Sequence, residues 1–141
     1  MAAVTVTKAD VRQMGKIHGS IVNPYLTGEA LSNGDAVYLH TDKTVKKADG
    51  NVDVATARAI GIVCNTPNST AGDAASGDIV SVCEFGPVTG FSSATVGSLG
   101  YVSDTVGKVD TVAGTFARIL GRFQSADVFF VQPVLTDAAS A

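Results

Sequence analysis

The segment Gly34-Asp35-Ala36-Val37-Tyr38-Leu39-His40-Thr41-Asp42, followed by Ala57-Arg58-Ala59-Ile60-Gly61, sets the architecture that we expect for this chain. A similar arrangement returns as Gly97-Ser98-Leu99-Gly100-Tyr101-Val102-Ser103-Asp104, followed by Ala117-Arg118-Ile119-Leu120-Gly121. A third, partial version is Gly77-Asp78-Ile79-Val80-Ser81-Val82. Repetition of strand-sized units indicates a structural scaffold rather than an active site.

The apolar runs between the turns of this repeat predict β-strands. Residues 36–39 are bounded by Asn33-Gly34 and by a polar turn, and residues 59–64 form a continuous apolar run typical of a buried central strand. Further strands are expected over residues 78–85, 99–103, 108–112, 117–123 and 127–133. Because Ile60 and Leu120 hold equivalent places in the repeat, both are expected in the core.

Together these segments predict an all-β protein, a small β-barrel or sandwich of about 8–10 short strands with an extended N-terminal arm. One short helix is expected over residues 54–58. We divide the chain into an extended arm (residues 1–28), a β-domain (29–135) and a flexible tail (136–141). The arm lacks a helical stripe, so we expect it to pack poorly on its own domain and to be ordered by a partner. A mobile terminus without a role is the alternative.

The composition argues against several classes of function. The chain has 141 residues, a net charge of −3 and no basic run that could follow a phosphate backbone, so nucleic-acid binding is not expected. No apolar run approaches the ~18 residues that a membrane-spanning helix needs. The first residues lack the pattern of a secretory signal. Abundant Gly, Val and Thr favour strands joined by tight turns.

Residues that could carry out chemistry are few and scattered. His18 lies in the arm and His40 at a strand end, with no nucleophile motif near either, so no catalytic residue and no enzyme activity are expected. Cys64 and Cys83 match no metal or redox motif. Two buried thiols are the simpler interpretation of these cysteines, and a disulfide between neighbouring strands is the alternative. The two histidines and two cysteines are too scattered along the chain to predict a zinc site. No cofactor is expected.

Other polar residues have a structural interpretation beside a chemical one. Asp35 and Asp78 follow glycines, where a carboxylate usually accepts hydrogen bonds from turn amides, although a pair of carboxylates could serve acid–base chemistry. Arg58 and Arg118 are equivalent in the repeat, and each could bind an internal carboxylate or a partner. The turn Thr41-Asp42-Lys43-Thr44 is similar to the hairpin of lipoyl carrier domains, but the segment before it is too short, so an ordinary turn lysine is expected.

Five motifs follow one another along the chain. They are Gly-Glu-Ala-Leu-x-x-Gly-Asp-Ala-Val-Tyr-Leu (28–39), Ala-x-Ala-Ile-Gly-Ile-Val (57–63), Gly-Asp-Ile-Val-Ser-Val-x-x-Phe-Gly-Pro-Val-x-Gly (77–90), Gly-x-Leu-Gly-Tyr-Val-Ser-Asp-Thr-x-Gly-Lys-Val (97–109) and Arg-Ile-Leu-Gly-Arg-Phe-x-Ser-Ala-Asp-Val-Phe-Phe-Val-Gln-Pro (118–133). In this order they resemble the small capsid decoration, or cement, proteins of tailed bacteriophages. The resemblance covers about residues 28–133 and consists of turns and aliphatic residues, without a catalytic signature.

The resemblance implies a structural virion protein on the capsid exterior, made in the cytoplasm of the bacterial host. It implies a compact β-domain that binds the major capsid protein, commonly as a trimer at local three-fold positions. Such a domain bridges capsomers and braces them against internal DNA pressure. The resemblance implies no enzyme activity and no cofactor, and neither a nucleic acid nor a membrane is expected as a partner.

The arm lies outside the strongest part of the resemblance, and we infer that it is a capsid-binding strap. An extended segment gains backbone hydrogen bonds when it adds a strand to a partner's sheet edge, and several arms on one oligomer bind with avidity. The residues expected to bind the partner are Val4, Val6, Lys8, Arg12, Lys16, His18 and Tyr25.

The alternative function is that of a head- or tail-fibre domain that recognises a host-surface glycan. Exposed aromatic residues near polar clusters would serve that role, and Tyr25, Tyr38 and Tyr101 are the candidates. Removal of residues 2–27 is expected to separate the two functions. A cement protein would stay folded and lose capsid binding, whereas a glycan-binding domain would keep its ligand.

Overall fold

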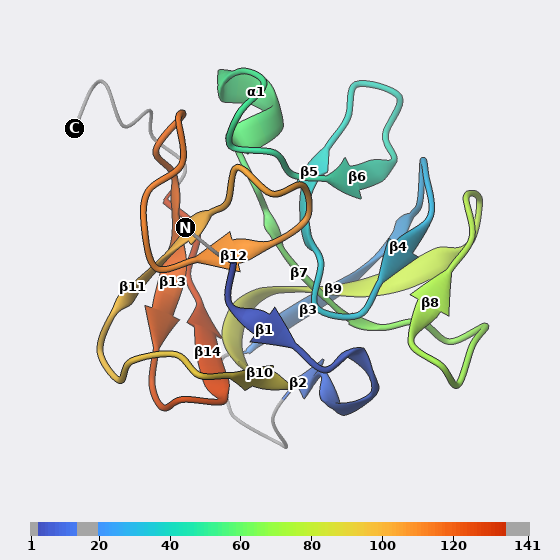
Figure 1. Cartoon of the computed structure of the whole chain (residues 1–141). Helices are drawn as coiled ribbons and strands as arrows, with labels where there is room; N and C mark the ends of the chain where they lie inside the picture. Colours follow the sequence, from blue (N-terminus) through green and yellow to red (C-terminus); the bar gives the residue numbers. More distant parts are fainter. Residues whose placement is uncertain (1–2, 14–19, 135–141) are drawn as a thin grey trace.

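The computed structural model describes residues 3–13 and 20–134 and is nearly all β (Figure 1). Its strands are β1 (Thr5–Val6), β2 (Arg12–Gln13), β3 (Ile21–Leu26), β4 (Leu31–Ser32), β5 (Ala36–Leu39), β6 (Val45–Lys47), β7 (Gly61–Asn65), β8 (Asp73–Ala74), β9 (Ile79–Thr89), β10 (Phe91–Ser92), β11 (Leu99–Val102), β12 (Val109–Asp110), β13 (Ile119–Phe123) and β14 (Val128–Val131). Its helical elements are a 3₁₀ turn over Lys8–Asp10 and the helix α1 (Val54–Ala57). The predicted all-β class and the predicted short helix are confirmed. The expected tail lies outside the described residues.

The long strand β9 belongs to two sheets. Its first half pairs with β3 on one edge and with β7 on the other, and β5 and β6 continue that sheet. Its second half pairs with β14 and, on the opposite edge, with β2; β13, β11 and β12 continue this second sheet. The change of sheet falls at Gly86, whose φ of 128° favours glycine, and Pro87 follows it. The strands therefore curl into a half-barrel.

The sequence repeat is also a structural repeat. In the first copy β5 pairs with both β6 and β7, and in the second copy β11 pairs with both β12 and β13, always antiparallel. Gly34, Gly77 and Gly97 have φ values of 93°, 92° and 85°. In each of these turns the N–H that follows the glycine donates to the carbonyl three residues earlier, which is a β-turn that requires a positive φ at its third residue. One turn geometry therefore starts β5, β9 and β11.

The two copies of the repeat meet at a seam. Ala36 N–H donates to the carbonyl of Gly107, and Gly107 N–H donates to the carbonyl of Ala48, at 2.9 and 2.7 Å. Gly50 N–H donates to the carbonyl of Ser103 at 2.9 Å. These bonds hold the far ends of the curled sheet together.

Two apolar cores lie on opposite faces of the wall formed by β5, β7 and β9. Because side chains alternate between faces along a strand, Ala36 and Ile62 belong to one core and Val37 and Val63 to the other. The first core lies inside the curl and is the larger one. The second core lies on the other side of the wall, where Leu31 of β4 contributes to it.

The larger core is organised around aromatic rings. Their centroids lie 4.7–5.8 Å apart in tilted and edge-to-face pairs, and the rings are those of Phe91, Phe123 and Phe129. Leu120 is buried in this core, as predicted. Ile60 is only half-buried and packs against the smaller core, so the two equivalent residues of the repeat differ in burial.

The N-terminal segment is extended, as predicted, but it is part of the domain. Strand β1 pairs with β10, and β2 and β3 both pair with β9 (Figure 1). Val11 is buried in the larger core, and Val4 and Val6 pack against that core. The expectation that this segment packs poorly on its own domain is therefore wrong for its described residues. Strands β1 and β2 are only two residues long, which is too short for a recognisable pattern of alternation.

Candidate binding surface at strand β3

Strand β3 lies at the edge of the first sheet, and among residues 3–13 and 20–134 no strand pairs with its outer edge along residues 21–25. Within the described residues β9 is its strand partner, and the outer edge is closed at its end, where a parallel bridge joins Thr27 to Val45. Thr27 N–H donates to the carbonyl of Asp78, on the side of β9. The next residue, Gly28, donates its N–H to the carbonyl of Val45, on the opposite side. The direction of the backbone groups therefore alternates here, as it does in any antiparallel strand.

This alternation assigns the two edges of β3. The backbone groups of Asn23 and Tyr25 face β9, and those of Val22, Pro24 and Leu26 face outward. Pro24 has no N–H, and it lies where the ladder to β9 requires none. The open edge therefore presents the N–H groups of Val22 and Leu26 and the carbonyl groups of Val22 and Pro24, whereas the carbonyl of Leu26 lies at the bridge to Val45.

Apolar side chains are exposed beside this edge. Ile21, Val22 and Leu26 are 50%, 39% and 48% exposed. Ile79, which lies opposite Leu26 in the register, is 54% exposed. Clustered exposed apolar groups mark interaction sites. We name Ile21, Val22, Pro24, Leu26 and Ile79 the β3 surface.

The opposite face of β3 carries Asn23 and Tyr25; Tyr25 packs against the smaller core, and both side chains are bonded to β9. Tyr25 donates its hydroxyl hydrogen to Oε1 of Glu84 at 2.6 Å, and the amide of Asn23 donates to the other carboxylate oxygen. Burial, and next the hydrogen bond to Glu84, raises the pKa of Tyr25 to about 12. The phenol is therefore a permanent donor near neutral pH, and it anchors β3 without closing its outer edge.

A groove of about 710 Å³ begins beside Val22. Its lining comes from the N-terminal segment (Ala9 and Val11), from β9 (Ser81) and from the loop over residues 65–70. The groove therefore extends the β3 surface toward the N-terminal segment.

Four of the residues predicted to bind a partner lie in the first part of the N-terminal segment. Val4 and Val6 pack against the larger core and are half-buried. Lys8 Nζ forms an ion pair with the carboxylate of Asp73 at 2.8 Å. Arg12 belongs to β2, which is paired with β9. The structure thus gives three of these side chains internal contacts.

The remaining predicted partner-binding residues are Tyr25, Lys16 and His18. Tyr25 is bonded to Glu84, as described, and Lys16 and His18 lie outside the described residues. The partner-binding role of all seven residues stays a prediction. The β3 surface was not predicted from the sequence, although a proline inside an apolar segment is a signal for an edge strand.

A second pocket, of about 440 Å³, lies between the β5–β6 turn and α1. Tyr38, His40, Asp53 and Arg58 line it. The rings of Tyr38 and His40 meet edge to face with centroids 6.1 Å apart. Asp53 caps α1, because its Oδ1 accepts the N–H of Thr56 at 2.7 Å. An aromatic ring beside polar groups is an arrangement that suits a sugar.

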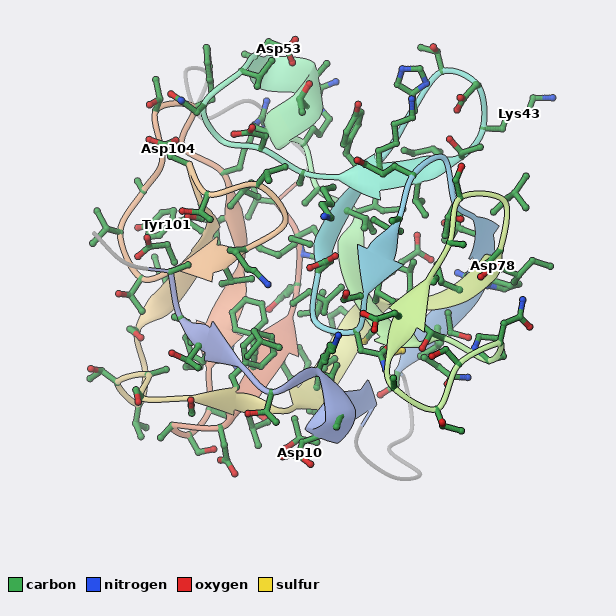
Figure 2. All side chains as sticks on the ribbon, turned by 45° about the vertical axis from the view of Figure 1, so that its right-hand side comes forward. Asp10, Lys43, Asp53, Asp78, Tyr101 and Asp104 are labelled. Carbon is green, nitrogen blue, oxygen red and sulfur yellow. The ribbon has the colours of Figure 1, made fainter. Side chains whose placement is uncertain are left out.

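The β5–β6 turn contains Lys43, which points away from the domain (Figure 2). Lys43 has a φ of 72°, and its N–H donates to the carbonyl of His40. Asp42 accepts hydrogen bonds from the hydroxyl and the N–H of Thr44, and these bonds lower the pKa of Asp42 to about 2. Lys43 is therefore an ordinary turn lysine, as expected.

The aspartates of the repeat bind turn amides, as predicted. Asp35 Oδ2 accepts the N–H of Ser32 at 2.8 Å, and Asp78 Oδ2 accepts the N–H of Ala75 at 2.9 Å. Asp35 differs in being only 3% exposed and in facing Lys108, whose Nζ lies 3.7 Å from Oδ1. Burial raises the pKa of Asp35 above its ordinary value, against the opposing effects of the Ser32 amide and Lys108.

Cys64 and Cys83 are both buried and are not joined in a disulfide, which confirms the simpler interpretation. Burial raises the pKa of Cys83 to about 12, so its thiol stays protonated and unreactive near neutral pH. Arg58 is exposed and Arg118 is buried, so these two equivalent positions of the repeat also diverge.

Among residues 3–13 and 20–134, no three His, Cys, Asp or Glu side chains gather as metal ligands would. The same part of the chain contains no helix that is long and apolar enough to cross a membrane. A scan against models of known protein families gives no match, and a search of curated proteins gives none either.

Proposed function

We propose that this chain is a structural protein of a tailed-phage virion. It binds the outer surface of the capsid, its partner is the major capsid protein, and it stabilises the shell by bridging capsomers. The working form is an oligomer, with a trimer favoured, on the capsid exterior after synthesis in the host cytoplasm. The order of turn and strand motifs over about residues 28–133 supports this proposal, as does a scaffold built from one repeated turn.

The observation that carries the proposal is the β3 surface. It combines an open strand edge with exposed apolar side chains, and it lies within the N-terminal segment to which we assigned the strap. Residues 4–11 of that segment are held on the domain by β1 and Val11. The proposed strap therefore narrows to residues 21–26.

Electron cryomicroscopy of particles from the phage that encodes the chain tests this proposal. We expect density of the size of one β-domain on the outer surface between capsomers, with β3 toward the shell. The double change Val22→Lys and Leu26→Lys should remove this density, because it places charges on the apolar contact. Val96→Lys changes an exposed valine in the turn before β11 and should leave the density unchanged. Absence of the protein from purified particles would contradict the proposal.

A second candidate function is glycan recognition at the pocket lined by Tyr38, His40, Asp53 and Arg58. The observation that favours it is the aromatic ring beside charged and polar groups. Binding of the full chain to an array of bacterial surface glycans tests it. Tyr38→Ala should abolish any specific signal, whereas Tyr101→Ala should not.

A further inference from the structure

We propose that the open edge of β3 accepts an extended strand from a partner protein. In this arrangement the chain supplies the sheet and the partner supplies the strand, which is the reverse of the arm-donation expected from the sequence. The identification of that partner as the capsid protein rests on the proposed function. The ability of β3 to accept a strand does not, because it follows from the backbone of β3 itself.

The open edge presents an incomplete ladder of hydrogen-bonding groups. The N–H groups of Val22 and Leu26 and the carbonyl of Pro24 between them all face outward. The outer side already forms one such bond where β3 ends, from Gly28 N–H to the carbonyl of Val45 at 3.0 Å. A strand laid along β3 from residue 22 up to the point where Val45 lies beside the edge would continue this pattern, which is the mode known as β-augmentation.

The side chains beside the edge define the chemistry of that strand. On one face, the exposed groups of Val22, Leu26 and Ile79 require apolar neighbours. On the other face lie the amide of Asn23 and the carboxylate of Glu84. Because neighbouring strands place their side chains on shared faces, the partner segment alternates between apolar and polar residues.

Pro24 argues that the strand comes from a different protein rather than from a second copy of this chain. Two β3 edges that pair around a two-fold axis would each contribute Pro24, so the lack of its N–H would be felt twice. A strand from another protein would meet this gap once. Proline on an edge strand is also a feature that disfavours pairing between like edges. Pairing between two β3 edges is therefore disfavoured, whereas a strand from another protein would lack only the one hydrogen bond that Pro24 cannot donate.

Nuclear magnetic resonance of the isotope-labelled full chain tests the inference. The probe is a capped synthetic peptide of about eight residues in which Val and Thr alternate; a Gly-Ser peptide of equal length is its control. We expect the Val-Thr peptide to slow hydrogen exchange at the amides of Val22 and Leu26. The amides of Asn23 and Tyr25, which already face β9, should not change.

A matched pair of variants separates the backbone from the side chain. Leu26→Pro removes one outward N–H, whereas Leu26→Val keeps that N–H and an apolar side chain. Loss of one hydrogen bond should weaken peptide binding roughly 2- to 10-fold in Leu26→Pro relative to Leu26→Val. If Leu26→Pro does not fold, the double change Val22→Lys and Leu26→Lys alters only exposed side chains and should abolish binding.

The possible outcomes divide clearly. Unchanged exchange at Val22 and Leu26 with saturating Val-Thr peptide, or equal slowing by the Gly-Ser peptide, would overturn the inference. Hydrogen exchange at Val22 and Leu26 that slows without peptide as the protein concentration rises would show that a second copy of the chain pairs with β3. That result would also overturn the inference. Failure of the Val-Thr peptide to bind at β3, with the protein still present on purified particles, would overturn strand acceptance and leave the proposed function standing. If the protein binds the peptide at β3 but is absent from virions, strand acceptance stands and the proposed function is overturned.

Discussion

Asp35 shows how one residue can serve two structural purposes. Its carboxylate completes the β-turn that starts β5, and the same group faces Lys108 at the seam between the two copies of the repeat. Asp78 occupies the equivalent turn but is half-buried and exposed to solvent on one side. The turn needs the hydrogen bond in both places, whereas the buried charge is a feature of the seam alone.

The raised pKa of Asp35 predicts a specific dependence of stability on pH. Because burial raises this pKa above the ordinary value of 3.8, protonation favours the folded state. The contribution of Asp35 to stability is therefore complete below its ordinary pKa and is lost as the pH rises through the raised value. Asp35→Asn is neutral at every pH, so its free energy of unfolding relative to the wild type should increase between about pH 4 and about pH 7. Urea denaturation at both pH values measures this difference.

Asp78→Asn is the matched control for that experiment, since it changes the same turn away from the seam. Its difference from the wild type should vary less with pH. A difference for Asp35→Asn that stays constant or decreases toward neutral pH would contradict the assignment.

The repeated elements β5–β6–β7 and β11–β12–β13 show that equal topology does not bring equal burial. The first copy lies between two cores, because Leu31 of β4 and Ala74 of β8 pack with its outer face in the smaller core. The second copy contributes to the larger core alone. Leu120 therefore points into the larger core, whereas Ile60 lies at the margin of the smaller one.

This difference predicts unequal effects of truncation at the two positions. Leu120→Ala should lower the free energy of unfolding by about 2–5 kcal/mol, because it leaves a cavity in a packed core. Ile60→Ala should cost less, about 1–2 kcal/mol, because Ile60 already contacts solvent. Urea denaturation of both variants measures the pair. Equal losses would contradict the structure, and they would instead support our sequence-based expectation that both residues are core.

The N-terminal segment packs across the whole domain and forms part of its structure. Val4 N–H donates to the carbonyl of Val109, Thr7 N–H donates to that of Gly90, and Val11 enters the larger core. The segment therefore touches both sheets before β3 begins. Removal of residues 2–27, which we had expected to leave a folded domain, would delete these contacts and β3 together.

Removal of residues 2–11 should therefore destabilise the domain. We expect the free energy of unfolding to fall by about 2–4 kcal/mol, chiefly because Val11 loses its burial. Lys8→Ala is the control, since an exposed ion pair such as the one with Asp73 contributes little to stability. Thermal and urea denaturation of both proteins give the comparison. A truncated chain as stable as the wild type would show that the segment packs only loosely.

The fold could be predicted from the sequence where the pattern is local. Gly34, Gly77 and Gly97 mark turns that need a positive φ, and the apolar run at 59–64 contains the buried strand β7. The candidate site could not be predicted in the same way. Whether residues 21–26 face a partner or their own sheet depends on pairing with β9, about sixty residues away along the chain.

Strand β9 has a mechanical consequence. It pairs along its length with β3, β7, β2 and β14, so it is hydrogen-bonded to neighbouring strands in both sheets. Tension applied to β3 along its axis would load the ladder to β9 in shear, where several hydrogen bonds must yield together instead of unzipping in turn. That load would then pass through the bend at Gly86 into the second sheet. A pull on this single edge would be shared by the entire domain.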